Sequence, residues 1–424
     1  MKKLIALLLL FPQSGVFAQN LTLDSCINSA FRKYEFQADR ADFITQSELS
    51  IKNANKAWLP TLELDASFTW QNENITIPVG INVPGIESPS VPLNFNRILV
   101  NFTQNIYDGS TSSRTKDLAA QTLKINQVSV EQQQINLESK VSALFMGVLL
   151  AREQKKILNS KSDLLEERLD VMEGALEYGG SMPATILSLE TEILKVEQQK
   201  TEITYQVKAL TAQLSEITGL SITEDDSFEN PNAVLVSSAS PSSRPEIRLL
   251  DLQSEQLEVQ KSLKMTSRNP RVFAFGNVGA GNPGYDIFAE QEISPMVFVG
   301  LGVKWNIIDW NYNRNEMTMI QLQQNQLDRV KSRMVSTFNE QTNAEKREIE
   351  MLNEQLKRDE KILQLQNSLT QIKSAQLENG VITSTEYLEA VDQLTEFKTQ
   401  QKVHELSLVM AIINYNLINE NPVQ

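Results

Sequence analysis

Two stretches of this chain, "LEYGGSMPATILSLE" (Leu176–Glu190) and "LENGVITSTEYLEA" (Leu377–Ala390), follow the same plan. Each reads Leu-Glu-x-Gly, then a few small or polar residues, then an apolar-periodic helix. Gly179 and Gly380 are 201 residues apart. Glycine ends helices readily because it adopts a left-handed backbone without Cβ strain. The sequence therefore predicts that the chain makes one helix-to-helix turn twice.

A second pair of segments repeats at the same distance. "NFTQNIYDG" (Asn101–Gly109) ends with Ile-Tyr-Asp-Gly, and "LGVKWNIIDW" (Leu301–Trp310) ends with Ile-Ile-Asp-Trp. Asp108 and Asp309 are again 201 residues apart. Two features at one offset indicate a tandem duplication, which has to be recognised before the fold is assigned.

Each half is predicted to contain a helix of modest length, a pair of strands, a very long helix and a shorter helix after the glycine turn. The first repeat, 19–219, has these elements at 25–57, 61–70, 97–107, 110–178 and 182–219. The second repeat, 244–419, has them at 244–266, 271–280, 296–308, 311–379 and 383–419. Residues 220–243 are expected to be a polar linker, and residues 420–424 a short tail.

The long helices are the clearest prediction. Residues 110–178 contain no proline, and residues 311–379 contain neither glycine nor proline. At about 1.5 Å per residue each would extend on the order of 100 Å. Apolar residues follow a heptad pattern along the helices, for example Leu137, Val141 and Leu144, so coiled-coil packing is expected. A cytoplasmic rod would share this pattern, but the start of the chain and the strands count against it.

The strands alternate apolar and polar residues over about ten positions. This pattern is typical of a transmembrane β-strand with one face toward lipid, although a soluble sheet with one wet face would show it too. The residues predicted to face lipid are Leu62, Leu64, Phe68, Val299, Leu301, Val303 and Trp305.

The first residues, "MKKLIALLLLFPQSGVFAQ", have a basic start, a short apolar run and a small-residue cleavage site, so residues 1–18 are expected to be a secretory signal peptide. No later segment has the roughly 20 apolar residues of a membrane helix. Four strands cannot close a barrel, since the smallest membrane barrels have eight, and lipid does not tolerate open sheet edges. If the strands enter a membrane, several copies of the chain must share one barrel.

Composition excludes several classes of function. The net charge of −14 argues against a nucleic-acid partner, because phosphate binding needs clustered Lys and Arg. One cysteine, Cys26, and one histidine, His404, cannot build a structural zinc site. Cys26 is expected to be a small buried side chain, and His404 a surface or packing residue. No nucleophile motif or phosphate-binding loop is present, so neither an enzymatic activity nor a cofactor is expected.

Taken together, the chain resembles the TolC-like family of outer-membrane efflux proteins over nearly its whole length. The resemblance rests on the duplicated order of elements, on Pro60 before the first strand, and on "IYDG" at the end of the second strand. "SRPEI" at the start of the second half and the turn that begins at Gly380 complete it.

The resemblance implies a mainly α fold with membrane β-strands. Each protomer of a homotrimer would give four strands to a shared twelve-stranded barrel, and long α-helical hairpins would form a tunnel, an α-barrel, across the periplasm. The two glycine turns would be hairpin tips where a periplasmic adaptor docks. The tip residues are Gly179, Gly180, Pro183, Gly380, Val381 and Ile382.

Glu386 and Glu389 are three residues apart after the second turn and so share one helix face. In the family the matching positions are acidic and project into the tunnel near its narrow end. The resemblance thus implies rings of carboxylates, which would favour cations. The alternative is that both are ordinary first-turn acids stabilised by the helix dipole.

Two residues depart from the family pattern. Ile382 stands where a basic residue is found in a well-known member, and Thr185 is not acidic although it matches Glu386 in the first half. The closing lock of some members therefore cannot be carried over. We expect the tunnel to narrow here by other contacts.

The resemblance implies a passive duct in the bacterial outer membrane. It would receive drugs or other small molecules from an inner-membrane transporter through the adaptor and release them outside. A duct for polypeptides in type I secretion is the alternative within the family. A periplasmic coiled-coil scaffold with a soluble sheet is the alternative outside it.

Overall fold

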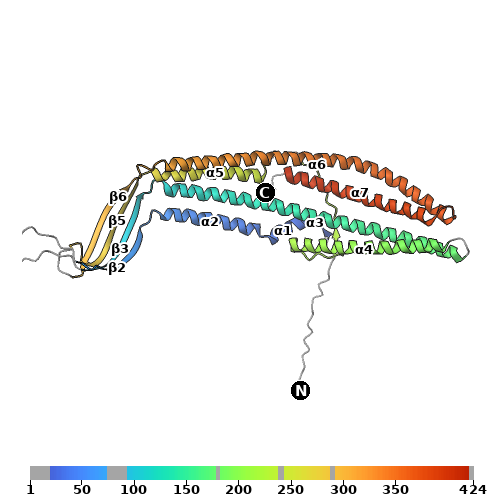
Figure 1. Cartoon of the computed structure of the whole chain (residues 1–424), viewed down its shortest axis with the longest axis horizontal. Coiled ribbons are helices and arrows are strands. Elements are labelled where there is room, and N and C mark those ends of the chain that lie inside the picture. The colour runs from blue at the N-terminus through green and yellow to red at the C-terminus, as the bar shows by residue number, and fades with distance from the viewer. Residues whose placement is uncertain (1–19, 74–92, 178–181, 237–242, 287–291, 420–424) are drawn as a thin grey trace, which may run out of the picture. The chain divides into compact units, whose positions relative to one another are not determined.

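The computed structural model in Figure 1 describes residues 20–73, 93–177, 182–236, 243–286 and 292–419. It divides into two compact units. The helical unit comprises Met1–Asp39, Val130–Ile247 and Arg333–Gln424, and the sheet unit comprises Arg40–Ser129 and Arg248–Ser332. The expected signal peptide and the tail at 420–424 lie outside the described residues, as do Gly179 and Gly180.

Helices make up most of the described chain. In chain order they are α1 (Leu23–Lys33), α2 (Phe36–Lys56), α3 (Thr111–Glu177), α4 (Pro183–Thr218), α5 (Pro245–Met265), α6 (Tyr312–Glu378) and α7 (Ser384–Asn419). A short 3-10 turn, Thr266–Arg268, follows α5. The strands are β1 (Asn20–Leu21), β2 (Thr61–Trp70), β3 (Asn94–Tyr107), β4 (Ser227–Phe228), β5 (Arg271–Asn282) and β6 (Ser294–Lys304).

The helical unit is built on two hairpins. α4 runs beside α3, and α7 runs beside α6 (Figure 1). α4 begins at Pro183, whose missing amide donor costs nothing in a first turn. It ends where Gly219 takes a φ of 73° and donates its N–H to the carbonyl of Ser215 at 2.8 Å. Local sequence thus fixes both ends of this helix.

One apolar cluster joins all four hairpin helices. α3 supplies Leu165 and Met172, and α4 supplies Leu189 and Val196. α6 and α7 add Leu377, Tyr387 and Val391. All seven side chains are buried. Burying a large apolar side chain stabilises a fold by about 1.5–3 kcal/mol, so this cluster holds the two hairpins together near their turns.

The segment expected to be a linker over 220–243 is partly ordered. β4 pairs in parallel with β1, and Phe228 packs on Phe145 of α3 at 5.3 Å between ring centroids. The guanidinium of Arg152 lies 5.0 Å from the Phe228 ring centroid and donates to the carbonyl of Glu224 at 3.0 Å. An aromatic side chain that can be buried anchors an otherwise polar segment to the long helix.

The sheet unit contains one antiparallel sheet in the order β2-β3-β5-β6 (Figure 1). The register places Leu64 opposite Val100, Val100 opposite Val278, and Val278 opposite Val297. Side chains directly opposite each other point to the same face of a sheet. The apolar positions of the four strands therefore form one continuous apolar face.

The opposite face has an aromatic cluster over glycines. Phe273 lies opposite Gly302, and Phe275 lies opposite Gly300. A Cβ at Gly302 would lie 2.6 Å from the Phe273 ring, and one at Gly300 would lie 3.0 Å from the Phe275 ring. The glycines of β6 thus leave room for the rings, which explains why β5 sets two phenylalanines among small residues.

The single helix expected over 25–57 is instead two helices. Glu35, between α1 and α2, has a φ of 51°, which no α-helix accommodates. The bend buries Phe36, whose ring packs edge-on against Phe31 at 5.9 Å and stacks on Tyr34 at 6.1 Å. Aromatic packing therefore overrides helix propensity at this point.

Three strands of the sheet differ from their expected bounds, β5 only by continuing two residues past 280, to Asn282. The strand expected over 296–308 ends at Lys304, because its last partner is Arg271, the first residue of β5. The strand expected over 97–107 begins three residues earlier, at Asn94, which pairs with Trp70. In both cases the partner strand decides where pairing stops.

The aspartates at the 201-residue offset lie before α3 and α6. Asp108 is 7% exposed and accepts hydrogen bonds from the backbone N–H groups of Ser110 at 2.9 Å and Ser112 at 2.7 Å. Burial opposes ionisation of its carboxyl, but the bonds from Ser112 and Ser110 outweigh it and lower the pKa of Asp108. Asp309 accepts the backbone N–H of Asn313 at a longer 3.3 Å, together with the side-chain amide of Asn313.

We predict that Asp108→Ala lowers the free energy of unfolding by about 1–2 kcal/mol, because two buried amides at the start of α3 lose their acceptor. Asp309→Ala is the matched control and should cost less than half as much. Thermal unfolding followed by circular dichroism measures both. Equal losses would show that the tighter cap at Asp108 adds no stability.

Candidate functional site

The second hairpin turn is built around Gly380. Its φ is 65°, and its N–H donates to the carbonyl of Leu377 at 3.0 Å. The N–H of Val381 reaches back to the carbonyl of Gln376 at 2.9 Å. These bonds satisfy carbonyls that the end of a helix leaves open, as in a Schellman motif. α7 follows after Thr383.

The two residues after Gly380 have different surroundings. Val381 is exposed, whereas Ile382 is half-buried and packs against the apolar cluster of the hairpins. Ile382 therefore adds to that cluster at the position where a basic residue would stand in the family pattern. Pro183 is the first residue of α4 and is exposed. Thr185 bonds back to Met182 through its backbone, N–H to carbonyl, at 2.9 Å.

Glu386 and Glu389 are both exposed on the first turns of α7. The Glu386 carboxylate accepts the backbone N–H of Thr383 at 2.9 Å and its hydroxyl at 3.1 Å. The N–H of Glu386 points back to the Thr383 hydroxyl at 3.4 Å, so the pair forms a capping box. The backbone bond from Thr383 lowers the pKa of Glu386. Among the described residues, Glu389 has no hydrogen bond or ion pair and remains the freer carboxylate.

Arg168 on α3 connects to the second hairpin by several contacts and was not singled out from the sequence. Its guanidinium forms an ion pair with Glu378 and donates to the hydroxyl of Ser374. It also lies 5.5 Å from the ring centroid of Tyr387, which is fully buried. One buried cation thus contacts residues from both α6 and α7.

Lys161, two turns earlier on α3, forms a second charged link. Its ammonium lies 2.8 Å from Glu192 on α4 and 2.6 Å from Asp392 on α7. The Lys161 side chain is only 6% exposed. Burial would lower its pKa, but Asp392 and Glu192 outweigh burial and raise the pKa of Lys161. Burial likewise opposes ionisation of Glu192, yet Lys161 lowers its pKa.

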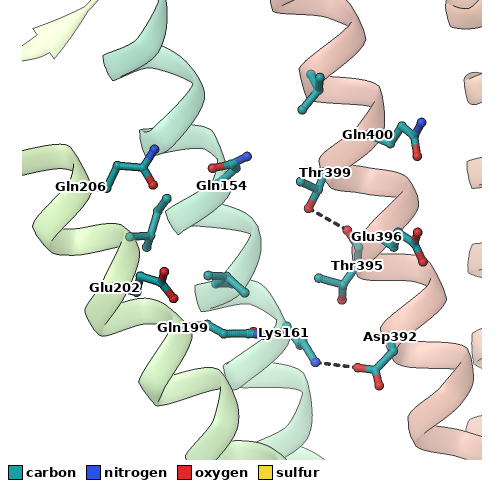
Figure 2. A pocket seen from close by; sticks show the side chains of 13 residues that line it. Gln154, Lys161, Gln199, Glu202, Gln206, Asp392, Thr395, Glu396, Thr399 and Gln400 are labelled. Atoms are coloured by element: carbon teal, nitrogen blue, oxygen red, sulfur yellow. Dashed lines mark hydrogen bonds and ion pairs between the residues drawn. The ribbon is translucent and has the colours of Figure 1, made fainter. Parts of the chain in front are cut away.

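Figure 2 shows a groove of about 590 Å³ next to this link, between α3 and α4 on one side and α7 on the other. Lys161 crosses it to reach Asp392 (Figure 2). Most of the residues that line the groove are polar by type, among them Glu202, Glu396 and Thr399, and apolar atoms form much of its surface. At this level the two hairpins therefore meet through an ion pair and polar groups, whereas near their turns they pack through the apolar cluster.

The residues predicted to face lipid are all exposed, and six of them lie together on the apolar face of the sheet. Trp305 lies beyond the end of β6 at Lys304, and its indole N–H donates to the carbonyl of Arg268 at 2.9 Å. No helix among the described residues combines the length and the apolar character needed to cross a bilayer. Nor, in that part of the chain, do three His, Cys, Asp or Glu side chains gather as metal ligands would.

Cys26 is fully buried in α1, where burial raises the pKa of its thiol to about 11. His404 lies between helices, with its Nδ1 2.6 Å from Asp359 of α6. Both residues have a packing role, as the sequence suggested.

Comparisons with known proteins give one consistent result. Residues 40–220 match the family described as outer membrane efflux protein. The structure of CusC has a TM-score of 0.75 and 12% identity, over 94% of this chain and 92% of CusC. The structure of VceC from Vibrio cholerae has a TM-score of 0.70 and 12% identity, over 95% of this chain and 97% of VceC. The structure of the Campylobacter jejuni CmeC outer membrane channel has a TM-score of 0.69 and 13% identity, over 93% of this chain and 85% of CmeC. No curated protein sequence matches the chain.

The resemblance to the TolC-like outer-membrane efflux proteins is confirmed. The predicted fold, long helical hairpins with a four-stranded sheet, is the fold of these channels. The match of residues 40–220 to this family and the likeness to these outer-membrane proteins agree with the expected outer-membrane location. The match to this family agrees with the expectation that the chain is not an enzyme.

We predict that Lys161→Met destabilises the helical unit by about 3 kcal/mol, because Glu192 is left buried without its main partner. Lys195 also contacts Glu192, at 3.2 Å, but is mostly exposed, so Lys195→Met is the matched control and should cost under about 1 kcal/mol. Chemical denaturation of the two variants measures both losses.

The pH dependence follows from the lowered pKa of Glu192. A carboxyl with a depressed pKa stabilises the fold above its ordinary value of 4.5, and that stability is lost as pH falls through the folded pKa. The gap between wild type and Lys161→Met should therefore narrow below pH 4.5. A gap that stays constant with pH would show that the loss comes from packing and not from charge.

Proposed function

We propose that three copies of this chain form a passive efflux duct through the outer membrane. Each copy would contribute β2, β3, β5 and β6 to a twelve-stranded barrel, and the helical hairpins would form a tunnel in the periplasm. The observation that carries this proposal is a four-stranded sheet with a continuous apolar face and two unpaired edge strands, β2 and β6. Lipid cannot satisfy the backbone groups of such edges, so the sheet has to close with other copies.

The duplication supports the repeat boundaries at 19–219 and 244–419, with 220–243 between them. Each repeat supplies one hairpin, so a trimer would present six hairpin turns in a ring. We propose that a periplasmic adaptor docks on these turns. Val381 supports this role because it is exposed although apolar. An inner-membrane transporter would provide the energy and select the substrates, among them drugs or other small molecules.

The acidic residues near the turn suit the narrow end of such a tunnel. Rings of carboxylates favour cations. Glu389 is the better candidate, since its carboxylate has no partner among the described residues, whereas Glu386 holds the start of α7. We therefore assign cation preference chiefly to Glu389 and helix capping chiefly to Glu386.

Single-channel recording in a planar bilayer tests the duct and this division of roles. We predict a cation-preferring conductance whose preference falls in Glu389→Gln. Glu386→Ala should keep most of the preference but lower the free energy of unfolding by about 1 kcal/mol through loss of the capping box.

If neither substitution changes the cation preference, the proposal of a duct stands and the acidic ring is excluded. Purified, folded protein that does not insert into bilayers at all would contradict the duct.

The charged contacts of Arg168 give a second test. If opening of the tunnel requires the hairpins to separate, Arg168→Met should favour the open state, because its bonds to Glu378 and Ser374 are lost. A buried charged hydrogen bond contributes about 1.5–3 kcal/mol, so a rise in open probability of about tenfold or more is expected. Arg152→Met, which acts on the β4 segment, is the control and should leave open probability unchanged. A smaller open probability in Arg168→Met would contradict this role.

A further inference from the structure

A cavity of about 360 Å³ lies in the helical unit, between α1, α3, α7 and the segment 229–234. Its volume falls in the range of small-molecule sites. As far as the chain is described, no residue of the hairpin turns and none of the residues predicted to face lipid lines it. The cavity is therefore distinct from the sites assigned to the duct and to its adaptor.

The chain segment 229–236, here called the strap, forms one wall of the cavity and is held at both ends. At one end the backbone N–H of Glu229 donates to a carbonyl of β1 at 3.0 Å. At the other end Asn416 of α7 accepts the N–H of Val236 at 3.0 Å and donates to the carbonyl of Val234 at 2.8 Å. The side-chain amide of Asn416 thus pairs with the strap as a neighbouring strand would. The wall is fixed by hydrogen bonds, so the cavity is formed before any ligand binds.

The charge of the lining favours a cation. Asp24 of α1, Glu138 of α3 and Glu229 of the strap all line the cavity, and no Lys, Arg or His does so among the described residues. α1 also begins here, and the N-terminus of a helix attracts anions. Thr22 opposes this effect, because its side chain accepts the N–H of Ser25 at 3.2 Å in a capping box. Three carboxylates and a capped helix start leave an anion little to bind.

Ser142 supplies an independent sign of a ligand. It lines the cavity and is 0% exposed, and its hydroxyl has no hydrogen-bond partner among the described residues. A buried polar group without a partner costs free energy, so such a group requires an explanation. Ser142 follows Glu138 by one turn on the same face of α3. An ammonium group has three N–H donors and can bond to both side chains.

The carboxylates are separated by apolar surface. Ile413 and Leu417, one turn apart on α7, line the cavity and are half-buried, as is Ile27 of α1. Asp24 and Glu229 are exposed and mark the open side of the cavity. In the described part of the chain, acidic side chains do not gather as the ligands of one metal ion would. Separated carboxylates with apolar side chains between them match two positive charges joined by a hydrocarbon chain.

We propose that this cavity binds an unbranched aliphatic diamine with both amino groups protonated. One ammonium group bonds to Glu138 and Ser142, and the other lies between Asp24 and Glu229. The hydrocarbon chain packs on Leu417 and its apolar neighbours. The bound diamine joins α1, α3, α7 and the strap at the end of α7 opposite its turn. This site goes beyond the proposed duct and does not depend on it.

Isothermal titration calorimetry of the purified full-length protein in neutral detergent tests the proposal. The probes are unbranched diamines with terminal amino groups, from propanediamine to octanediamine, and the monoamines of the same lengths. A charge-assisted hydrogen bond changes an equilibrium by about tenfold or more, so the best diamine should bind at least about tenfold more tightly than its monoamine. One chain length should bind best, and added NaCl should weaken the binding because salt screens exposed charges.

Substitutions in the lining give a second readout. By the same hydrogen-bond energies, Glu138→Gln should weaken diamine binding by about tenfold and Ser142→Ala by at least about threefold. Glu153→Gln is the matched control, since Glu153 is also half-buried on α3 but does not line the cavity, and it should leave the affinity unchanged. Circular dichroism confirms that each variant folds. Asp24 is exposed, so Asp24→Asn keeps the test if Glu138→Gln does not fold, and it should also weaken binding.

Four outcomes would overturn the proposal. The first is that no diamine of the series binds, and the second is that a monoamine binds as tightly as its diamine. The third is that MgCl₂ displaces the diamine more effectively than NaCl of equal ionic strength, which would indicate a metal site. The fourth is that Glu153→Gln weakens binding as much as Glu138→Gln, which would indicate a general effect of net charge.

Discussion

Unpaired edges of a four-stranded sheet are the constraint on which the architecture depends. β2 and β6 each leave one row of backbone N–H and C=O groups without a partner among the described residues. The sheet also exposes an apolar face along its whole width. Water can hydrogen-bond to the edge groups but disfavours the exposed apolar face. Lipid favours the apolar face but offers the edge groups no hydrogen bonds. In the proposed duct, pairing with further copies satisfies both. The opposite face of the sheet also has a defined packing, because the glycines of β6 leave room for the phenylalanine rings of β5.

The duplication then determines how the helices pack. Two hairpins of equal design arise from one plan, and the apolar cluster of Leu165, Leu189, Leu377 and Tyr387 binds them near their turns. Away from the cluster they are held by charges, with a polar groove alongside. The apolar cluster packs firmly near the turns, whereas ion pairs join the hairpins farther along. The ion pairs can therefore loosen while the cluster keeps the hairpins attached.

Much of the fold was predictable because its signals are local. Alternation over ten residues predicted β2, and the absence of glycine and proline predicted α6. The break at Glu35 was not predictable, because no glycine or proline marks it and aromatic packing of Phe36 causes it. The end of β6 was also missed, since the alternation continues past Lys304 and only the partner strand decides where pairing stops.

The site was less predictable than the fold. Charged residues on a long helix usually belong to a solvated face, so Arg168 and Lys161 were not singled out. A signal did exist in the comparison of the two halves. At the 201-residue offset these cations align with Leu369 and Ile362, and a seam position that is charged in one repeat and apolar in the other marks a specialised contact. The capping box of Thr383 and Glu386 was likewise visible as Thr-x-x-Glu.

That difference between the halves bears on how a duct of this kind can open without falling apart. A ring of hairpins must keep some contacts and release others, and two identical kinds of seam would give no reason for one to yield before the other. Water compensates part of the attraction that a buried ion pair loses when it separates. An apolar contact has no such compensation. Within this chain the two hairpins are joined by ion pairs of the buried Lys161 and Arg168 and by the apolar cluster near their turns. In the proposed duct, opening should therefore separate these ion pairs before it disturbs the apolar cluster.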